Sequence, residues 1–150
     1  MNVGHADGVG EVLLAGILQS LALARPGVAR ALWIDTLIDS SIFREWVVNV
    51  GRRDTRARIA HLLCEFALRL QAVGIGDGRR YELPMTQEQL ADAVGLTSVH
   101  VNRVLRQLGE EGLISRDRRT LVLEDWQRLR QVGDFNERYL HHDLGNARVA

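Results

Sequence analysis

The twenty residues from Gln87 to Arg106 constrain the fold more than any other stretch of the chain. At seven structurally constrained places of this window the residue is small or apolar as required, namely Leu90, Ala91, Val94, Gly95, Leu96, Val101 and Val104. A small alanine lets a second helix cross the first closely, and a glycine permits the positive φ of a tight turn between them. The spacing is typical of a helix-turn-helix unit.

Local signals predict where the two helices begin and end. Thr86 followed by Gln89 has the form of a capping box, which predicts a helix over residues 87–94. Gly95 ends that helix, and Thr97 caps a second one, expected over residues 97–111. The second helix would be the recognition helix of the unit.

The recognition helix is amphipathic, and its outer face carries groups that can contact a nucleic acid. Asparagine can form paired hydrogen bonds with adenine, arginine can do so with guanine, and valine can touch a thymine methyl group. The residues expected to read bases are Ser98, Val99, Asn102 and Arg103. The residues expected to contact the DNA backbone in this unit are Thr86, Thr97, His100 and Arg106. His100 has no partner at metal-ligand spacing, so a surface or phosphate-contacting role is expected for it.

A hairpin with a basic tip follows the recognition helix. Residues 113–115 and 120–123 alternate like strands around a four-residue connection. That connection contributes Arg116, Arg118 and Arg119. A solvated turn is the plain alternative, but beside a recognition helix we expect a wing that contacts phosphates.

The charge balance is neutral overall and arginine-rich locally. Nineteen basic and nineteen acidic residues give a formal net charge of zero, and every basic residue is arginine. A neutral total removes the simplest argument for nucleic-acid binding. A GC-rich coding sequence would explain the missing lysine, yet each guanidinium is still suited to phosphate or guanine.

Two helical patterns precede this unit. A short helix is expected over residues 11–24, and a longer one over residues 28–50, between the break at Arg25-Pro26-Gly27 and Gly51. The longer pattern has an apolar stripe that fits either a core helix or a dimer seam. The residues expected in a dimer seam are Leu32, Ile38, Ile42 and Trp46.

These elements predict a mainly α fold with a small β wing (α+β), a winged helix-turn-helix preceded by a long dimerisation helix. Asp54 would cap a helix over residues 55–73, residues 81–83 are a short strand at best, and Asp125 would cap a last helix over residues 126–132. An irregular tail is expected from Gly133. The expected divisions are an N-terminal remnant (1–25), a dimerisation helix (26–51) and a DNA-binding domain (52–150).

Several classes of function find no support in the residues. Cys64 is the single cysteine, which excludes an intramolecular disulfide, and no Cys/His spacing predicts a metal site. A buried structural thiol is expected, with a redox sensor as the lesser alternative. The apolar run over residues 12–24 is too short to span a bilayer, so a cytoplasmic protein with no membrane partner is expected. No catalytic constellation is visible, and we expect neither an enzyme nor a cofactor.

From about Pro26 to Tyr139 the sequence resembles the Crp/Fnr family of bacterial transcription regulators. The resemblance rests on residues 29–66, 81–114 and 118–135, which look like the family's dimerisation helix and first domain helix, its helix-turn-helix, and its wing with closing helix. It implies a homodimer on near-palindromic double-stranded DNA, with RNA polymerase left open as a further partner. Arg103 falls on the family's guanine-reading arginine, whereas Ser98 and Val99 replace a charged Arg and Glu.

The resemblance does not extend to the family's sensor. Only about 25 residues precede the expected dimerisation helix, and they do not read as the family's N-terminal β-roll. A fragment, a misplaced start and a sensorless regulator are all open, so no cyclic nucleotide or iron–sulfur cluster is carried over. The alternative function is an interaction protein that pairs with a full-length relative; retention of Arg103 and of the basic wing tip favours DNA binding.

Overall fold

Two long helices form the N-terminal part of the chain. The computed structural model describes residues 4–141, with side chains described from residue 13. Helix α1 spans Gly4–Ala24 and helix α2 spans Pro26–Arg52, so Arg25 is the single residue between them. Proline suits the first position of a helix because its missing N–H has no helical partner there. No helix among residues 4–141 combines the length and apolar character needed to cross a membrane.

Both helices are longer than the sequence predicted. Helix α1 begins at Gly4 rather than near residue 11, and α2 passes through Gly51, which was expected to end it. A Cβ placed on Gly51 would have nothing within 4 Å. Because glycine weakens a helix only moderately, the surrounding helix-forming residues override it.

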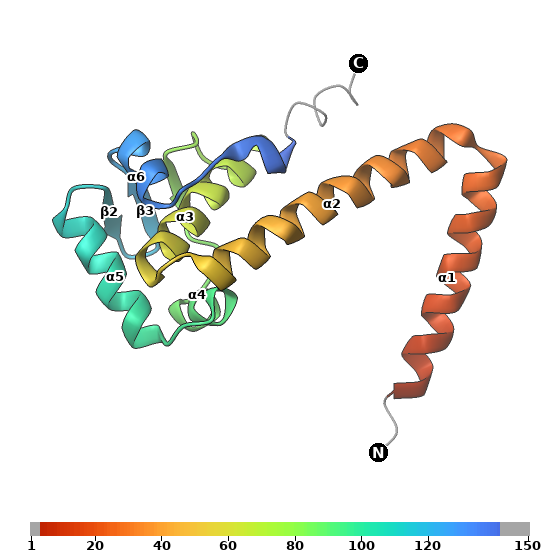
Figure 1. The fold of residues 1–150 in the computed structure, drawn as a ribbon, viewed down its shortest axis with the longest axis horizontal. Coiled ribbons are helices and arrows are strands. Elements are labelled where there is room, and N and C mark those ends of the chain that lie inside the picture. Colours follow the sequence, from red (N-terminus) through yellow and green to blue (C-terminus); the bar gives the residue numbers. More distant parts are fainter. Residues whose placement is uncertain (1–3, 142–150) are drawn as a thin grey trace. The chain divides into compact units, whose positions relative to one another are not determined.

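The described chain divides into two compact units at Ser41, and α2 runs through that boundary. The second unit, from Ile42 onward, holds the end of α2 and all later elements (Figure 1). Its helices are α3 (Thr55–Ala72), α4 (Gln87–Val94), α5 (Ser98–Glu110) and α6 (Trp126–Val132). The structure confirms the predicted fold class, a mainly α chain with a small antiparallel sheet.

The sheet has three strands, one more than the predicted hairpin. The strands β1 (Arg80–Glu82), β2 (Ile114–Asp117) and β3 (Thr120–Leu123) lie in the order β1-β3-β2. Both pairings are antiparallel, with Tyr81 opposite Leu121 and Ile114 opposite Leu123. The short segment around Tyr81 is a strand because β3 supplies hydrogen-bond partners that its own sequence does not reveal.

Helix α3 lies at the centre of the second unit. Seven consecutive residues, from Ile59 to Glu65, are buried, so the helix is covered on all sides over two turns. Asp54 caps its first turn as predicted, accepting a hydrogen bond from the Ala57 N–H at 2.8 Å. The Tyr81 hydroxyl donates to the Leu63 carbonyl at 2.8 Å and so ties the sheet to this helix.

Residues 133–141 contain regular and buried structure, which corrects the expectation of an irregular tail for this part; residues 142–150 of the expected tail lie outside the described residues. A 3₁₀ helix, η1, spans Glu137–Leu140, and Phe135, Tyr139 and Leu140 are buried in the core. Gly133 permits this return of the chain because its backbone lies directly against α3. A Cβ added to Gly133 would stand 2.6 Å from the backbone nitrogen of His61. The tail sequence lacks helical periodicity, so its burial depends on α3 rather than on local pattern.

Two glycine substitutions should change stability in opposite directions. Gly133→Ala should lower the free energy of unfolding by about 1–3 kcal/mol, because the methyl group meets backbone atoms that have no room to move. Gly51→Ala should raise it by about 0.5–1 kcal/mol, because an exposed helical site gains helix propensity. Urea unfolding of both variants would measure this; a stable Gly133→Ala protein would contradict the close approach of α6 to α3.

Candidate nucleic-acid interface

Helices α4 and α5 meet at a turn built by local hydrogen bonds. The predicted capping box is present: the Thr86 hydroxyl accepts from the Gln89 N–H at 3.2 Å, and the Gln89 side chain accepts from the Thr86 N–H at 2.9 Å. Gly95 follows α4 with φ +65°, in the left-handed region. The Leu96 N–H then donates to the Ala91 carbonyl at 2.9 Å, which closes the end of α4.

Helix α5 buries one face and exposes the other, as the sequence predicted. Its buried residues are Val101, Val104, Leu105 and Leu108. Among the expected base readers, Val99, Asn102 and Arg103 are exposed and Ser98 is half-buried in the first turn. Val99 is 74% exposed and lies in the first turn of α5. The outer face is therefore open to a partner.

The N-terminus of α5 is organised by Thr97 and His100. The Thr97 hydroxyl accepts from the His100 N–H at 3.4 Å and also lies 2.9 Å from His100 Nδ1. The ring of His100 is therefore held beside the helix N-terminus, where free N–H groups and the helix dipole favour an anion. This link between the two side chains was not anticipated from the sequence.

The wing presents its arginines beside α5. Arg116, Arg118 and Arg119 are all exposed, and Arg118 adopts φ +53° at the tip. The Arg116 Nε–H donates to the Arg118 carbonyl at 2.9 Å, which braces the turn. An open hollow runs between the outer part of α5 and β2. It is lined by Asn102, Arg106, Glu110, Ser115 and Arg116, among others. The structure thus brings the predicted wing and recognition-helix residues to neighbouring surfaces.

Two arginines that the sequence analysis missed fix the helix-turn-helix to α3. Arg58 donates to the Val94 carbonyl at 3.3 Å, at the end of α4. Arg56 forms an ion pair with Glu111, the residue that caps the C-terminus of α5. Each partner lies tens of residues away in the chain, so no local pattern could have identified these contacts.

The residues predicted for a dimer seam fall into two groups. Leu32 is exposed and Ile38 half-buried in the first unit. Ile42 and Trp46 are half-buried against the core of the second unit, and the Trp46 indole N–H donates to the Glu65 carboxylate at 3.0 Å. The exposed large apolar residues of α2 are Leu32, Trp33, Leu37, Phe43, Val47, Val48 and Val50.

Cys64 is a buried structural thiol, as expected. It has no exposed surface, and burial raises the pKa of its thiol to about 12. Such a group is protonated at neutral pH and therefore a poor nucleophile. Within residues 4–141 no three His, Cys, Asp or Glu side chains are grouped as a metal site would require.

Comparison with known proteins identifies the architecture. The family of Crp-like helix-turn-helix domains matches residues 57–132, half of the chain. The chain belongs to the Crp/Fnr family of transcription regulators. It is 33% identical over 117 residues to the transcriptional activator protein FnrL of Cereibacter sphaeroides, covering 75% of this chain and 47% of that protein.

Other members of the Crp/Fnr family give the same result. The nitrogen fixation regulation protein FixK of Rhizobium meliloti is 34% identical over 113 residues, covering 75% of this chain and 46% of that protein. The structure of FixK2 from Bradyrhizobium japonicum superposes with a TM-score of 0.70 at 29% identity, covering 78% of this chain and 57% of that one. The chain spans about half the length of the curated relatives it matches.

Proposed function

We propose that this Crp/Fnr-family chain is a homodimer that binds a near-palindromic site in double-stranded DNA, with α5 in the major groove. The observation that carries the proposal is the division of α5 into a buried face and an open face of DNA-compatible side chains. Such a helix gains nothing in stability from an exposed Val99 or Arg103. A regulator of this kind acts in the cytoplasm, and no catalytic activity is part of the proposal.

The base-reading surface consists of Ser98, Val99, Asn102 and Arg103. Arg103 donates two hydrogen bonds to a guanine, and Asn102 pairs with an adenine. Val99 contacts a thymine methyl group, which explains an exposed apolar residue in the first turn of the helix. Ser98 lies in the same turn, where it can accept or donate.

The DNA backbone is held by a second set of residues around this surface. Thr86, Thr97 and His100 lie at the starts of α4 and α5, where backbone N–H groups can also meet a phosphate. Arg106 and the wing residues Arg116, Arg118 and Arg119 supply positive charge. Displacement of counterions by these arginines provides much of the affinity, although the whole chain is neutral.

The exposed apolar side chains of α2 form the proposed dimer contact. Pairing of two such helices would place two recognition helices about one duplex turn apart, which is the geometry a palindromic site requires. A full-length relative could occupy the same face of α2, but an antagonist of that kind would not need Arg103 or the basic wing. RNA polymerase is a further partner for a regulator that activates transcription.

Selection of bound duplexes from a random pool tests the proposal directly. The purified wild-type chain should enrich a symmetric site, and an unenriched pool would exclude sequence-specific binding.

Arg103→Ala should cost about 1–3 kcal/mol in affinity for that site and relax the preference at one base pair per half-site. An equal loss on every sequence would instead assign Arg103 to the phosphate backbone.

The wing arginine Arg118 should contribute without regard to sequence. Arg118→Ala should weaken binding evenly across sites and reduce the slope of log affinity against log salt by about one for each protomer. Fluorescence anisotropy over a salt series measures both quantities. A slope identical to that of the wild type would place Arg118 outside the footprint.

The dimer contact is tested best at Phe43, because Trp46 supports the core of its own chain. Phe43 is 71% exposed, so Phe43→Asp should leave the fold intact and place a charge within the seam. Sedimentation should show a dimer for the wild type and a monomer for the variant. Gln127→Asp, an equal charge on an exposed position of α6, is the matched control and should remain dimeric.

A further inference from the structure

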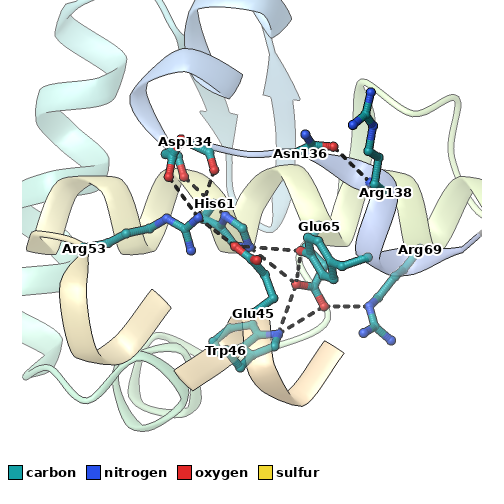
Figure 2. A network of polar contacts seen from close by, with 11 residues as sticks. Glu45, Trp46, Arg53, His61, Glu65, Arg69, Asp134, Asn136 and Arg138 are labelled. Atoms are coloured by element: carbon teal, nitrogen blue, oxygen red, sulfur yellow. Dashed lines mark hydrogen bonds and ion pairs between the residues drawn. The ribbon is translucent and has the colours of Figure 1, made fainter. Parts of the chain in front are cut away.

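A buried polar cluster joins the end of α2, the middle of α3 and the C-terminal segment, and the proposed DNA contacts do not use it. Figure 2 shows it around His61 and Glu65, which are 0% and 4% exposed. Polar side chains are rarely buried this deeply unless they are paired. The groups that face His61 come from three parts of the chain: Glu45 from α2, Glu65 from α3, and the Gly133 carbonyl and Tyr139 from the C-terminal segment.

His61 contacts two groups through its two ring nitrogens. Nδ1 lies 3.2 Å from the Gly133 carbonyl oxygen, and Nε2 lies 2.9 Å from the Tyr139 hydroxyl. The Tyr139 hydroxyl donates to Glu65 Oε2 at 2.6 Å. Glu65 also accepts from the Trp46 indole N–H at 3.0 Å and from Arg69 Nε at 2.7 Å.

The contacts His61–Gly133, His61–Tyr139 and Tyr139–Glu65 each need one proton. A neutral imidazole and the Tyr139 hydroxyl supply two protons between them, so one contact lacks a hydrogen. The Gly133 carbonyl and the Glu65 carboxylate can only accept, and Tyr139 carries a single proton. With Nε2 protonated, the chain from His61 through Tyr139 to Glu65 is complete, and Nδ1 faces the Gly133 carbonyl with no hydrogen between them. A second proton on Nδ1 would complete that bond and give His61 a positive charge.

The charges around His61 set the energetic cost of that proton. Burial, followed by the nearby Arg53 guanidinium, lowers the pKa of His61 below 6.5, while the Gly133 carbonyl, Glu45 and Glu65 act in the opposite direction. A lowered folded-state pKa means that the unfolded chain binds the proton more readily. The resulting stability is present above about pH 6.5 and is lost as the pH falls through the folded-state pKa.

His61 and Arg53 face the same oxygen atom of Glu45. Arg53 Nη2 lies 2.7 Å from Glu45 Oε1, and His61 Nε2 lies 4.0 Å from it. Arg53 also donates from Nη2 to the Asp134 carbonyl at 2.9 Å, whereas its Nε and Nη1 are buried with no partner among the described residues. Since α2 ends at Arg52 and α3 starts at Thr55, Arg53 holds the junction between these helices through one nitrogen atom.

We propose that His61 is a proton-dependent positioning residue for this junction. Neutral His61 leaves Glu45 to Arg53, and the end of α2 stays fixed on α3. The positive charge of protonated His61 repels the Arg53 guanidinium beside the Glu45 oxygen that both residues face, and this repulsion loosens the junction and weakens binding to DNA. The effect on DNA rests on the proposed function, because it requires that α2 sets the position of two recognition helices in a dimer.

The direction of the pH effect separates this role from that of His100. Positive charge gained on the proposed DNA surface, where His100 lies, would strengthen DNA binding. A proton gained by His61 would weaken it, by up to about tenfold per pH unit for each protomer below the folded-state pKa. A fall in affinity on acidification therefore cannot arise from the histidine at the DNA surface.

The first test follows His61 in the full chain without DNA. In NMR spectra of histidine-labelled protein, the ring of His61 should titrate below pH 6.5, and the Trp46 indole N–H signal should shift over the same range. Amide exchange at residues 52–56, corrected for the intrinsic pH dependence, should accelerate as His61 gains its proton. A ring that stays neutral down to the acid unfolding of the domain, or titrates with no change at the junction, would overturn the proposal.

The second test measures affinity for the selected DNA site between about pH 8 and about pH 5.5. His61→Gln supplies an amide in place of the Nε2–H, never gains a proton and should remove the acid loss of affinity. Tyr139→Phe, a second variant, should shift the midpoint of that loss because His61 loses its hydrogen-bond partner. His141→Gln, at an exposed histidine beyond η1, is the matched control and should keep the wild-type pH profile.

The outcomes distinguish this proposal from the proposed function. If His61 titrates and the junction loosens but no DNA site is bound at any pH, the proposed function fails and the proton-dependent junction stands. If DNA is bound and His61→Gln retains the wild-type acid loss, the positioning role of His61 fails and DNA binding stands. Failure of both glutamine and phenylalanine variants to fold would leave the wild-type NMR titration to decide.

Discussion

The burial of the middle of α3, from Ile59 to Glu65, is the constraint on which the second unit depends. A helix covered over seven consecutive residues must present a core-compatible side chain in every direction, yet two of these residues are His61 and Glu65. The apolar side chains of this stretch stabilise the fold because their burial removes apolar surface from water. The two polar side chains must instead form hydrogen bonds inside the protein. The end of α2 and the C-terminal segment supply these partners, so the packing of three chain segments depends on two side chains one helical turn apart.

The same helix also positions the elements of the proposed DNA interface. Arg58 and Arg56 connect α3 to the ends of α4 and α5, and the apolar face of α5 completes the core beneath them. The exposed face of α5 contributes little to this packing. Side chains on that face, including the proposed base readers Ser98, Val99, Asn102 and Arg103, can therefore be replaced with little effect on the fold.

The parts of the structure that the sequence predicted well are those that depend on neighbours within a few residues. The capping box at Thr86, the caps at Asp54 and Asp125, and the turn at Gly95 are formed by groups three or four positions apart. The parts it missed depend on distant partners. Strand β1 exists because β3 pairs with it, Trp46 turns toward Glu65 nineteen residues away, and the burial of Tyr139 depends on His61. Ile42 and Trp46 of α2 belong to the predicted dimer stripe but are half-buried against the core of their own chain. An apolar stripe alone therefore could not distinguish a core role from a dimer contact.

The return of the chain at Gly133 means that the folding unit is longer than the segment matched by the family of Crp-like helix-turn-helix domains. The family match ends at Val132, one residue before the backbone turns back against α3. A domain cut at that boundary would retain every element of the helix-turn-helix and the wing. It would nevertheless leave the His61 ring without both of its partners and uncover the Glu65 carboxylate. Residues 133–140 therefore cover part of the interior of the second unit, and the limits of the family match are a poor guide to where this protein can be truncated.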